Sequence, residues 1–231
     1  MSEAGRIALF SSAIVVVVIA LIIFGLILFR VHKIKKKIKQ EQMNLINQLA
    51  IEAGEKAVLA RADYDQPLAE LKSQISDAPD HENVEFCLNT CIRNKFKTVL
   101  FISKTSPYEV ITLAHKAQVF AYVEKINFNY QAYLDVTKIF QFEHQLEVID
   151  QLNLEQKYDA ILNLNDCINA DQTLEKYWPY LNENGMFIFA NTKKFKTDIK
   201  KLVKKISKIK CKYDILKWHN GFVTIVKTKG E

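Results

Sequence analysis

Hydrophobic positions follow three different patterns along this chain. Residues 7–29 form an apolar run without a charged side chain, and residues 33–62 place apolar side chains at helical spacing. From about residue 83 onward, short apolar runs alternate with amphipathic stretches. At 1.5 Å per residue the apolar run is about 34 Å long as a helix, enough to cross a hydrocarbon core of about 30 Å. The pattern predicts an N-terminal segment with a transmembrane helix (1–32), a basic juxtamembrane helical stalk (33–66) and an α/β domain (67–231).

Strands and helices alternate in the predicted domain. Apolar, β-branched runs predict strands over residues 98–103, 118–125, 146–150, 158–165 and 186–192. Amphipathic patterns predict helices over residues 68–75, 82–96, 106–117, 127–140, 173–181 and 193–212. In the last of these helices, one stripe is apolar and the remaining positions are rich in lysine, so we expect the stripe to pack on a sheet. Strands that alternate with helices favour a parallel sheet.

The end of the chain departs from this alternation. Residues 212–218 and 222–227 read as two strands, and His219-Asn220-Gly221 lies between them. A tight turn containing Asn-Gly is typical of an antiparallel hairpin. We therefore expect an α/β fold of three layers, with a mostly parallel sheet that ends in an antiparallel hairpin.

Basic side chains lie almost entirely on one side of the apolar run. Arg6 is the only one before it, whereas six Lys and Arg residues lie between Arg30 and Lys39. The positive-inside rule then predicts a single-pass cell-membrane protein with its N-terminus outside and its domain in the cytoplasm. The basic cluster is expected to contact anionic lipid headgroups, at about 1 kcal/mol per residue. A cleaved signal peptide is the alternative, but the apolar run is long and lacks a small-x-small cleavage site after Phe29.

The four cysteines are expected to be free thiols, because a cytoplasmic domain lies in a reducing compartment. Cys87 and Cys91 share a helical face, but no second pair of Cys or His residues supplies the other half of a zinc site. The sequence predicts no metal centre.

The order of these elements resembles the S-adenosyl-L-methionine-dependent methyltransferase fold, a Rossmann-like fold with a seven-stranded sheet. The resemblance covers about residues 83–227 and rests on three segments: VFAYVEKI, with Glu124 at the end of the second strand; KYDAILNLND; and YLNENGMFIFANT. Within the family, the chain resembles the membrane-anchored methyltransferase-like proteins of mollicutes. The resemblance implies S-adenosyl-L-methionine (SAM) as cofactor and methyl transfer as activity.

The loop after the first strand differs from the family pattern. The family has a glycine-rich loop there, whereas this chain has Ser103-Lys104-Thr105-Ser106-Pro107 and no glycine. Glycine would permit positive φ and a close approach of the backbone to a ligand. The hydroxyl groups of Ser103, Thr105 and Ser106 are therefore the candidate cofactor contacts in this loop.

Further candidates follow the other strands, at the sheet edge where open α/β folds bind ligands. The resemblance implies that Glu124 accepts hydrogen bonds from both ribose hydroxyls and that Asp150 approaches the adenine amine. Asn163 and Asn165 would line the cofactor site. Asp166 is the only one of the residues after the fourth strand that could act as a general base, so it is the catalytic candidate.

Two features distinguish the predicted site from a dinucleotide-binding site and from the site of a metal-dependent O-methyltransferase. An ordinary dinucleotide-binding domain also carries an acid near the position of Glu124, but Ser106 and Glu109 form a predicted capping box. A carboxylate at that helix N-terminus takes up the N–H donors and the positive end of the helix dipole that a pyrophosphate would need. SAM has no phosphate, so the carboxylate disfavours its binding less. In addition, Ala190-Asn191 stands where metal-dependent O-methyltransferases are expected to have Asp-Asn, which disfavours metal-dependent O-methylation.

Two other functions remain open. The glycine-free loop is also consistent with a degenerate methyltransferase fold that serves as a membrane-tethered interaction module. Nucleic-acid binding through the lysines of 193–212 is disfavoured, because no aromatic side chain interleaves with them and lysines outside a sheet-packed helix are usually solvated. The sequence identifies neither the methyl acceptor nor a protein partner.

Overall fold

The computed structural model describes residues 29, 33, 48, 51–58, 71, 75, 81–139, 145–165, 168–190, 192–209, 211–217 and 221–228. The chain divides into two compact units, Met1–Ala53 and Gly54–Glu231. The predicted membrane span lies almost wholly outside the described residues, as does the predicted boundary at 66/67, and both stay predictions. In the part of the chain that is described, no helix combines the length and the apolar character needed to cross a bilayer.

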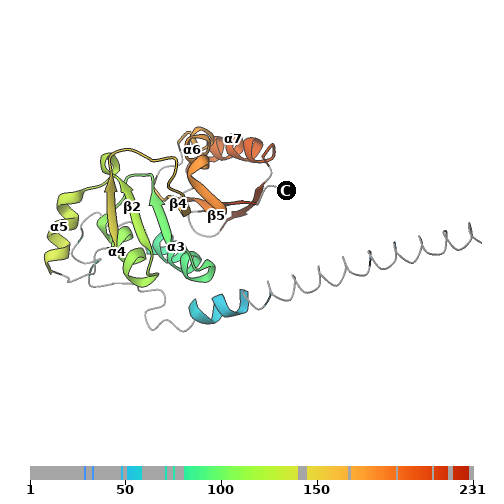
Figure 1. Ribbon diagram of the computed structural model, residues 1–231. Helices are drawn as coiled ribbons and strands as arrows, with labels where there is room; N and C mark the ends of the chain where they lie inside the picture. The colour runs from blue at the N-terminus through green and yellow to red at the C-terminus, as the bar shows by residue number, and fades with distance from the viewer. Residues whose placement is uncertain are drawn as a thin grey trace, which may run out of the picture. The chain divides into compact units, whose positions relative to one another are not determined.

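The second unit contains a seven-stranded sheet (Figure 1). Its strands are β1 (Thr98–Phe101), β2 (Phe120–Glu124), β3 (Leu146–Ile149), β4 (Tyr158–Asn163), β5 (Leu181–Ala190), β6 (Cys211–Leu216) and β7 (Phe222–Lys227). The order across the sheet is β3-β2-β1-β4-β5-β7-β6. Strands β1 to β5 are parallel, and β7 runs antiparallel to both β5 and β6. The predicted mostly parallel sheet with a terminal hairpin is therefore confirmed.

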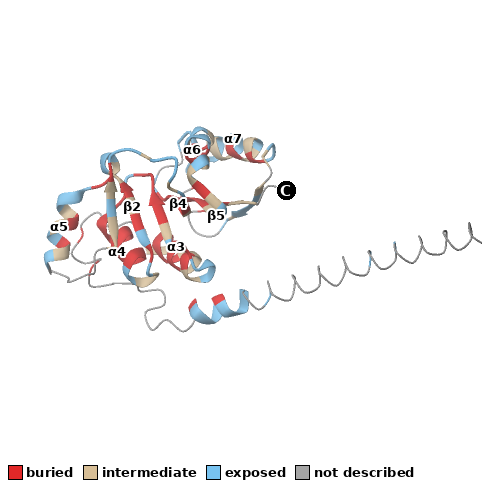
Figure 2. Ribbon diagram, viewed as in Figure 1, coloured by how far each residue is buried: buried red, intermediate tan, exposed pale blue. Residues whose placement is uncertain are grey.

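Helices cover both faces of this sheet and complete the three layers. They are α3 (His81–Asn94), α4 (Pro107–Lys116), α5 (Tyr130–Ile139), α6 (Ala170–Tyr177) and α7 (Lys196–Ile206), with 3-10 turns η1 (Lys125–Asn127) and η2 (Trp178–Tyr180). Side chains of α3, α4 and α5 share one hydrophobic core, and those of α6 and α7 share the other (Figure 2). Alternate residues of β1 serve the two cores: Val99 and Phe101 face the first and Leu100 the second. A strand buried on both faces reads as a continuous apolar run, as this one does.

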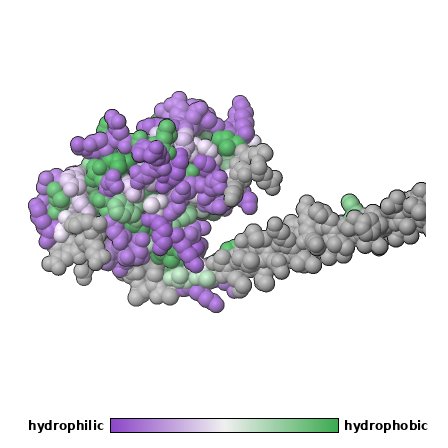
Figure 3. Space-filling model, viewed as in Figure 1, coloured by the Kyte–Doolittle hydropathy of each residue, from purple (hydrophilic) through white to green (hydrophobic). Residues whose placement is uncertain are grey.

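Helix α7 packs as its pattern predicts. Leu202 and Ile206 are buried in the second core, and Ile199 packs beside them. Lysines occupy its outer side, and Figure 3 shows hydrophilic residues over the outer surface of α6 and α7. The amphipathic stripe therefore decides how this helix is oriented on the sheet.

The terminal hairpin is fixed by a glycine and by an aromatic contact. Gly221 has φ of 78°, and a Cβ atom there would lie 2.5 Å from the Thr192 side chain, so no other residue fits without a shift. Immediately after the turn, the ring of Phe222 stacks on Phe86 of α3 with the ring centroids 4.1 Å apart. This contact ties β7 to the helix that precedes the first strand.

Strand β5 differs from the prediction. It begins at Leu181 rather than at 186, and its register with β4 shifts between the pairs Tyr158↔Leu181 and Ala160↔Met186. The extra residues form a bulge in which Gly185 lies so close to the Asp159 carbonyl that a Cβ atom would be 3.0 Å from it. Helix α6 ends earlier than expected, because Pro179 has no N–H group with which to continue it.

Candidate functional site

Two cavities open at the carboxyl edge of the parallel strands, near the ends of β1, β2 and β4. The β2–α5 cavity has a volume of about 680 Å³, and the β4–α6 cavity has one of about 560 Å³. The first is lined by Lys104, Thr105, Ser106, Ile126, Asn127, Phe128, Asn129 and Asn165. The second is lined by Ile102, Ser103, Lys104, Asn127, Asn163, Ile168, Asn169, Gln172, Thr173, Lys176 and Tyr177. Lys104 and Asn127 belong to both linings and separate the two spaces.

The residues predicted from the sequence are distributed between these cavities. Ser103 and Asn163 line the β4–α6 cavity. Thr105, Ser106 and Asn165 line the β2–α5 cavity. The sheet edge thus brings together most of the predicted set, but it does not place that set around a single cavity.

Side-chain hydrogen bonds hold the glycine-free loop in place. The Ser103 hydroxyl accepts a hydrogen bond from the Leu164 N–H at 3.1 Å, which joins the end of β1 to the end of β4. The Thr105 N–H donates to the Asn127 carbonyl at 3.0 Å, which joins the same loop to the β2–α5 connection. Ser103 and Thr105 are both buried. The Ser103 hydroxyl and the Thr105 N–H therefore fix the loop between its neighbours.

The predicted capping box of α4 is present. The Ser106 hydroxyl accepts from the Tyr108 N–H at 3.3 Å, and the Ser106 N–H donates to Glu109 Oε2 at 2.8 Å. Asn165 Nδ2 donates to Glu109 Oε1 at 3.2 Å and to the Lys104 carbonyl at 2.5 Å. The buried Glu109 carboxylate occupies the helix N-terminus, which makes this end of α4 unfavourable for a phosphate group.

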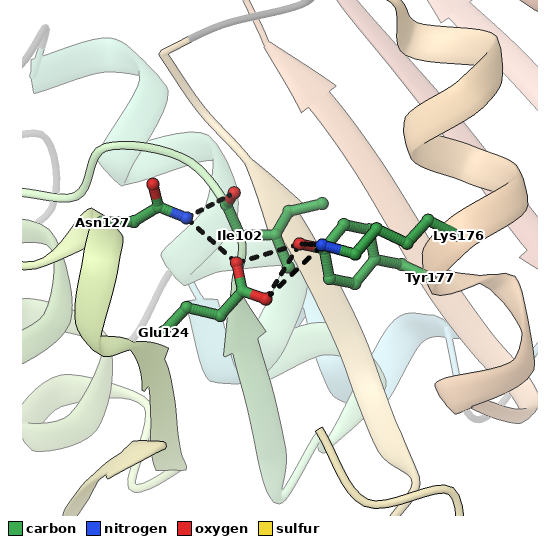
Figure 4. A network of polar contacts seen from close by, with 5 residues as sticks. All are labelled: Ile102, Glu124, Asn127, Lys176 and Tyr177. Atoms are coloured by element: carbon green, nitrogen blue, oxygen red, sulfur yellow. Dashed lines mark hydrogen bonds and ion pairs between the residues drawn. The ribbon is translucent and has the colours of Figure 1, made fainter. Parts of the chain in front are cut away.

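Glu124, at the end of β2, lies at the centre of a polar network (Figure 4). Asn127 Nδ2 donates to Glu124 Oε2 at 2.9 Å and to the Ile102 carbonyl at 3.2 Å. The Tyr177 hydroxyl donates from α6 and lies 2.9 Å from each carboxylate oxygen. Lys176 Nζ is 4.0 Å from Glu124 Oε1, and the Glu124 side chain keeps 16% of its surface exposed. The carboxylate is therefore held from both sides and remains partly open to solvent.

Tyr177 is a hydrogen-bond donor throughout the ordinary pH range. Burial raises the pKa of its hydroxyl, and the neighbouring Glu124 carboxylate raises it further. Lys176 Nζ donates to the same hydroxyl oxygen at 2.9 Å and lies 4.5 Å from the centre of the Tyr177 ring. The phenol therefore connects a cation to a carboxylate at one wall of the β4–α6 cavity.

Asp150 and Asp166 are the two remaining predicted residues. Asp150, after β3, pairs with Lys125 at 3.1 Å, and both side chains are largely exposed. It lines neither cavity. Asp166 lies outside the described residues, so its catalytic role stays a prediction.

The sequence interpretation missed Asn127, Lys104, Lys176 and Tyr177. Tyr177 was assigned only to a helix, and its pattern gives no sign of a contact with a residue 53 positions earlier. Asn127 could have been considered, because a polar side chain three residues after a strand-end acid can reach it in a tight turn. Lys104 belongs to the glycine-free loop, and its positive charge is the signal that could have marked it as a residue that lines a cavity.

A metal centre does not emerge among the described residues, in which no three His, Cys, Asp or Glu side chains lie together in a suitable arrangement. Burial raises the pKa of Cys91 to about 12 and that of Cys87 well above its ordinary value. Both are free thiols within the first core. They are hydrophobic packing residues.

Solved methyltransferases have a similar fold. A methyltransferase from Podospora anserina with bound S-adenosylhomocysteine (SAH) is 13% identical, with a TM-score of 0.55 over 82% of this chain and 96% of that one. An O-methyltransferase from Bacillus cereus in complex with SAH is 14% identical, with a TM-score of 0.53 over 78% and 91%. TomG, an O-methyltransferase from Streptomyces achromogenes in complex with SAM, is 12% identical, with a TM-score of 0.53 over 77% and 90%. At these identities the similarity is one of fold.

No family model and no curated protein sequence matches the chain. The methyltransferase fold is thus established by the strand order and the structural similarity. The predicted α/β sheet with its antiparallel end is confirmed, and the transmembrane helix and stalk that were expected to precede it stay predictions.

Proposed function

We propose that this chain is a membrane-anchored, SAM-dependent methyltransferase whose domain faces the cytoplasm. The observation that carries the proposal is the Glu124 carboxylate, which is partly exposed at the end of β2 and is held there by Asn127 and Tyr177. Both of these residues line the β4–α6 cavity, whereas Glu124 itself lines neither cavity. Each carboxylate oxygen has two lone pairs, so a carboxylate suits the paired hydroxyls of a ribose. Neighbours of the same fold carry SAM or SAH.

The residues at the carboxyl edge fit this cofactor in their chemistry. Glu124 would hold the ribose, and the hydroxyl and amide groups of Ser103 and Asn163 would line the cofactor site in the β4–α6 cavity. The side chains of Ser103 and Thr105 make hydrogen bonds to nearby backbone groups, which compensates in part for the missing glycines. When bound, SAM supplies an activated methyl group for transfer to a nucleophile.

The chain itself contributes mainly alignment. A methyl transfer needs the acceptor in line with the methyl group, and orientation alone accounts for a large part of such a rate increase. The polar and cationic lining formed by Gln172, Thr173, Lys104 and Lys176 would orient a polar acceptor. Asp166 is the proposed general base for an acceptor that must lose a proton.

The proposed attachment to the membrane rests on the sequence. Residues 7–29 would span the bilayer, and the basic residues from Arg30 to Lys39 would contact anionic headgroups on the cytoplasmic side. The domain would then work close to the membrane surface, which favours a lipid, a membrane-proximal protein or a small molecule as acceptor.

Calorimetry with SAM and SAH tests this proposal on the full-length chain in a mild detergent. We expect micromolar binding, and at least tenfold weaker binding after Glu124→Gln, because an amide offers only one oxygen acceptor to the ribose. Glu155→Gln is the matched control, since Glu155 is exposed and lines neither cavity. Equal affinity of the Glu124→Gln variant and the wild type would refute the assignment of the ribose site.

A second candidate is a membrane-tethered interaction module without catalytic activity. It is favoured by the glycine-free loop and by the fact that Tyr177 and Asn127 already satisfy Glu124. Transfer of a labelled methyl group to any acceptor by the purified chain, lost in the Glu124→Gln variant, would exclude it.

A further inference from the structure

The position of the Tyr177 hydroxyl relative to Glu124 is unusual for a simple supporting contact. Its oxygen lies at the same distance, 2.9 Å, from Oε1 and from Oε2. Equal distances place it on the plane that bisects the carboxylate, in front of both oxygens (Figure 4). Asn127, in contrast, contacts Oε2 alone, from the adjacent turn.

A ligand diol needs the same place. Two neighbouring hydroxyls that bind one carboxylate each donate to one oxygen, which puts the pair of hydroxyls in front of the carboxylate, across the same bisecting plane. The ligand diol and the Tyr177 hydroxyl therefore compete for the same lone pairs.

We propose that Tyr177 is the affinity-determining residue of the Glu124 site, where its hydroxyl is an intramolecular competitor of the ligand's vicinal diol. The inference rests on the proposed function, because it takes the ribose of SAM or SAH as that diol. A bound diol replaces one phenol donor by two hydroxyl donors and displaces Tyr177 from the carboxylate. A ligand with a single hydroxyl needs only one oxygen, so Tyr177 keeps the other.

The surroundings allow the displaced phenol a partner. Lys176 Nζ already donates to the Tyr177 hydroxyl at 2.9 Å and lies over the Tyr177 ring. Once the carboxylate is occupied by ligand, this contact still satisfies the hydroxyl oxygen. The phenol proton then has to find a new acceptor. Losing its hydrogen bond to the carboxylate costs free energy, and this cost lowers the affinity of the site for the ligand.

The exchange also concerns the wall of the β4–α6 cavity. Tyr177 is the last residue of α6, and Gln172, Thr173 and Lys176 of the same helix line that cavity. Displacing Tyr177 from Glu124 removes a tie between α6 and the end of β2. Occupation of the ribose site is therefore expected to change the part of the β4–α6 cavity in which these residues would orient the acceptor.

The test compares the wild type with Tyr177→Phe, which deletes only the competing hydroxyl. Binding of SAH and of its 2′-deoxy analogue is measured by calorimetry on the full-length chain in a mild detergent. We expect Tyr177→Phe to bind SAH about tenfold more tightly, because the ligand no longer has to break the hydrogen bond between the phenol and the charged carboxylate. The gain should be clearly smaller for the 2′-deoxy analogue.

Tyr158→Phe is the matched control. Tyr158 is also buried in the same core, but it begins β4 and its hydroxyl takes no part in the hydrogen bonds described for the Glu124 carboxylate. Its affinity for SAH should equal that of the wild type.

The outcomes separate this inference from the proposed function. Unchanged or weaker SAH binding by Tyr177→Phe overturns the inference alone, and Tyr177 is then a residue that positions Glu124. Binding by Tyr177→Phe but not by the wild type supports the inference and contradicts the proposed function, which requires the wild type to bind its cofactor. If neither protein binds SAH at millimolar ligand, both the proposed function and the inference fail.

Discussion

Asp159 is the clearest case of a single residue that organises the end of the sheet opposite the cavities. Its carboxylate accepts from the N–H groups of Lys97 and Thr98 at 2.7 and 3.1 Å, and from Asn182 Nδ2 at 2.8 Å. These contacts join the beginning of β1, the beginning of β4 and the bulge of β5. Burial by itself would raise the pKa of Asp159, but the hydrogen bonds outweigh it and hold the pKa below its ordinary value of 3.8.

Replacing Asp159 by Asn should lower the free energy of unfolding by about 2 kcal/mol at pH 7, because charge-assisted hydrogen bonds are lost. A lowered native pKa stabilises the fold above the unfolded value and loses this effect as the pH falls through the native value. The difference from the wild type should therefore be full at pH 7 and shrink below pH 4. Urea denaturation at both pH values measures it.

Asp135→Asn provides the comparison at this scale. Asp135 forms an exposed ion pair with Lys138 at 3.1 Å, and such pairs contribute about 0–1 kcal/mol. A loss of stability as large as that of Asp159→Asn would contradict the role that we assign to the Asp159 contacts.

At the scale of elements, α4 is the helix that connects sequence, stability and site. Its first turn is held by Ser106 and Glu109, and the same turn borders the β2–α5 cavity. We expect Ser106→Ala to lower the free energy of unfolding by about 1 kcal/mol, the usual effect of removing an N-cap side chain. Amide hydrogen exchange should also become faster at Tyr108, whose N–H donates to the Ser106 hydroxyl.

Ser207→Ala is the matched change at the other end of a helix. The Ser207 hydroxyl donates to the Lys204 carbonyl in an exposed position at the end of α7. Its removal should change stability by less than about 0.5 kcal/mol. If both serine variants are equally stable, the capping box contributes no more than a surface contact.

At the scale of the whole molecule, the proposed anchor makes a prediction about location. Deleting residues 1–29 should move the chain from the membrane fraction to the soluble fraction, because about 23 apolar residues would no longer partition into the bilayer. A C-terminal tag on the full-length chain should resist protease in intact cells and be cleaved after lysis. Retention of the deletion variant in the membrane fraction, or cleavage of the tag in intact cells, would contradict the proposed topology.

Patterns of short range were sufficient for much of this fold. The helix of α7 follows from apolar positions spaced at 3.6 residues, and the hairpin of β6 and β7 follows from two apolar runs around Gly221. Strand β1 is predicted because Val99, Leu100 and Phe101 form one apolar run between polar segments. Such features depend only on neighbours along the chain, and they can therefore be predicted without knowledge of the tertiary structure.

The bulge of β5 is a feature that local sequence patterns do not predict. Asn184-Gly185 reads as the close of the preceding helix, yet the strand already begins at Leu181 and continues through these residues. Whether a Gly-containing segment ends a strand or bulges within it depends on the neighbouring strand, here on Asp159 and its contacts.

The sequence by itself determined the type and order of the elements, the parallel sheet with its antiparallel end and the position of Glu124 after the second strand. These properties are encoded in local periodicity and turn residues, which act over a few positions. Only the tertiary structure decided that Tyr177 lies in front of Glu124, that Asn165 supports the cap of α4 and that the predicted residues line two cavities. Those contacts join residues more than 50 positions apart, so they arise from the packing of α6 and α4 on the sheet.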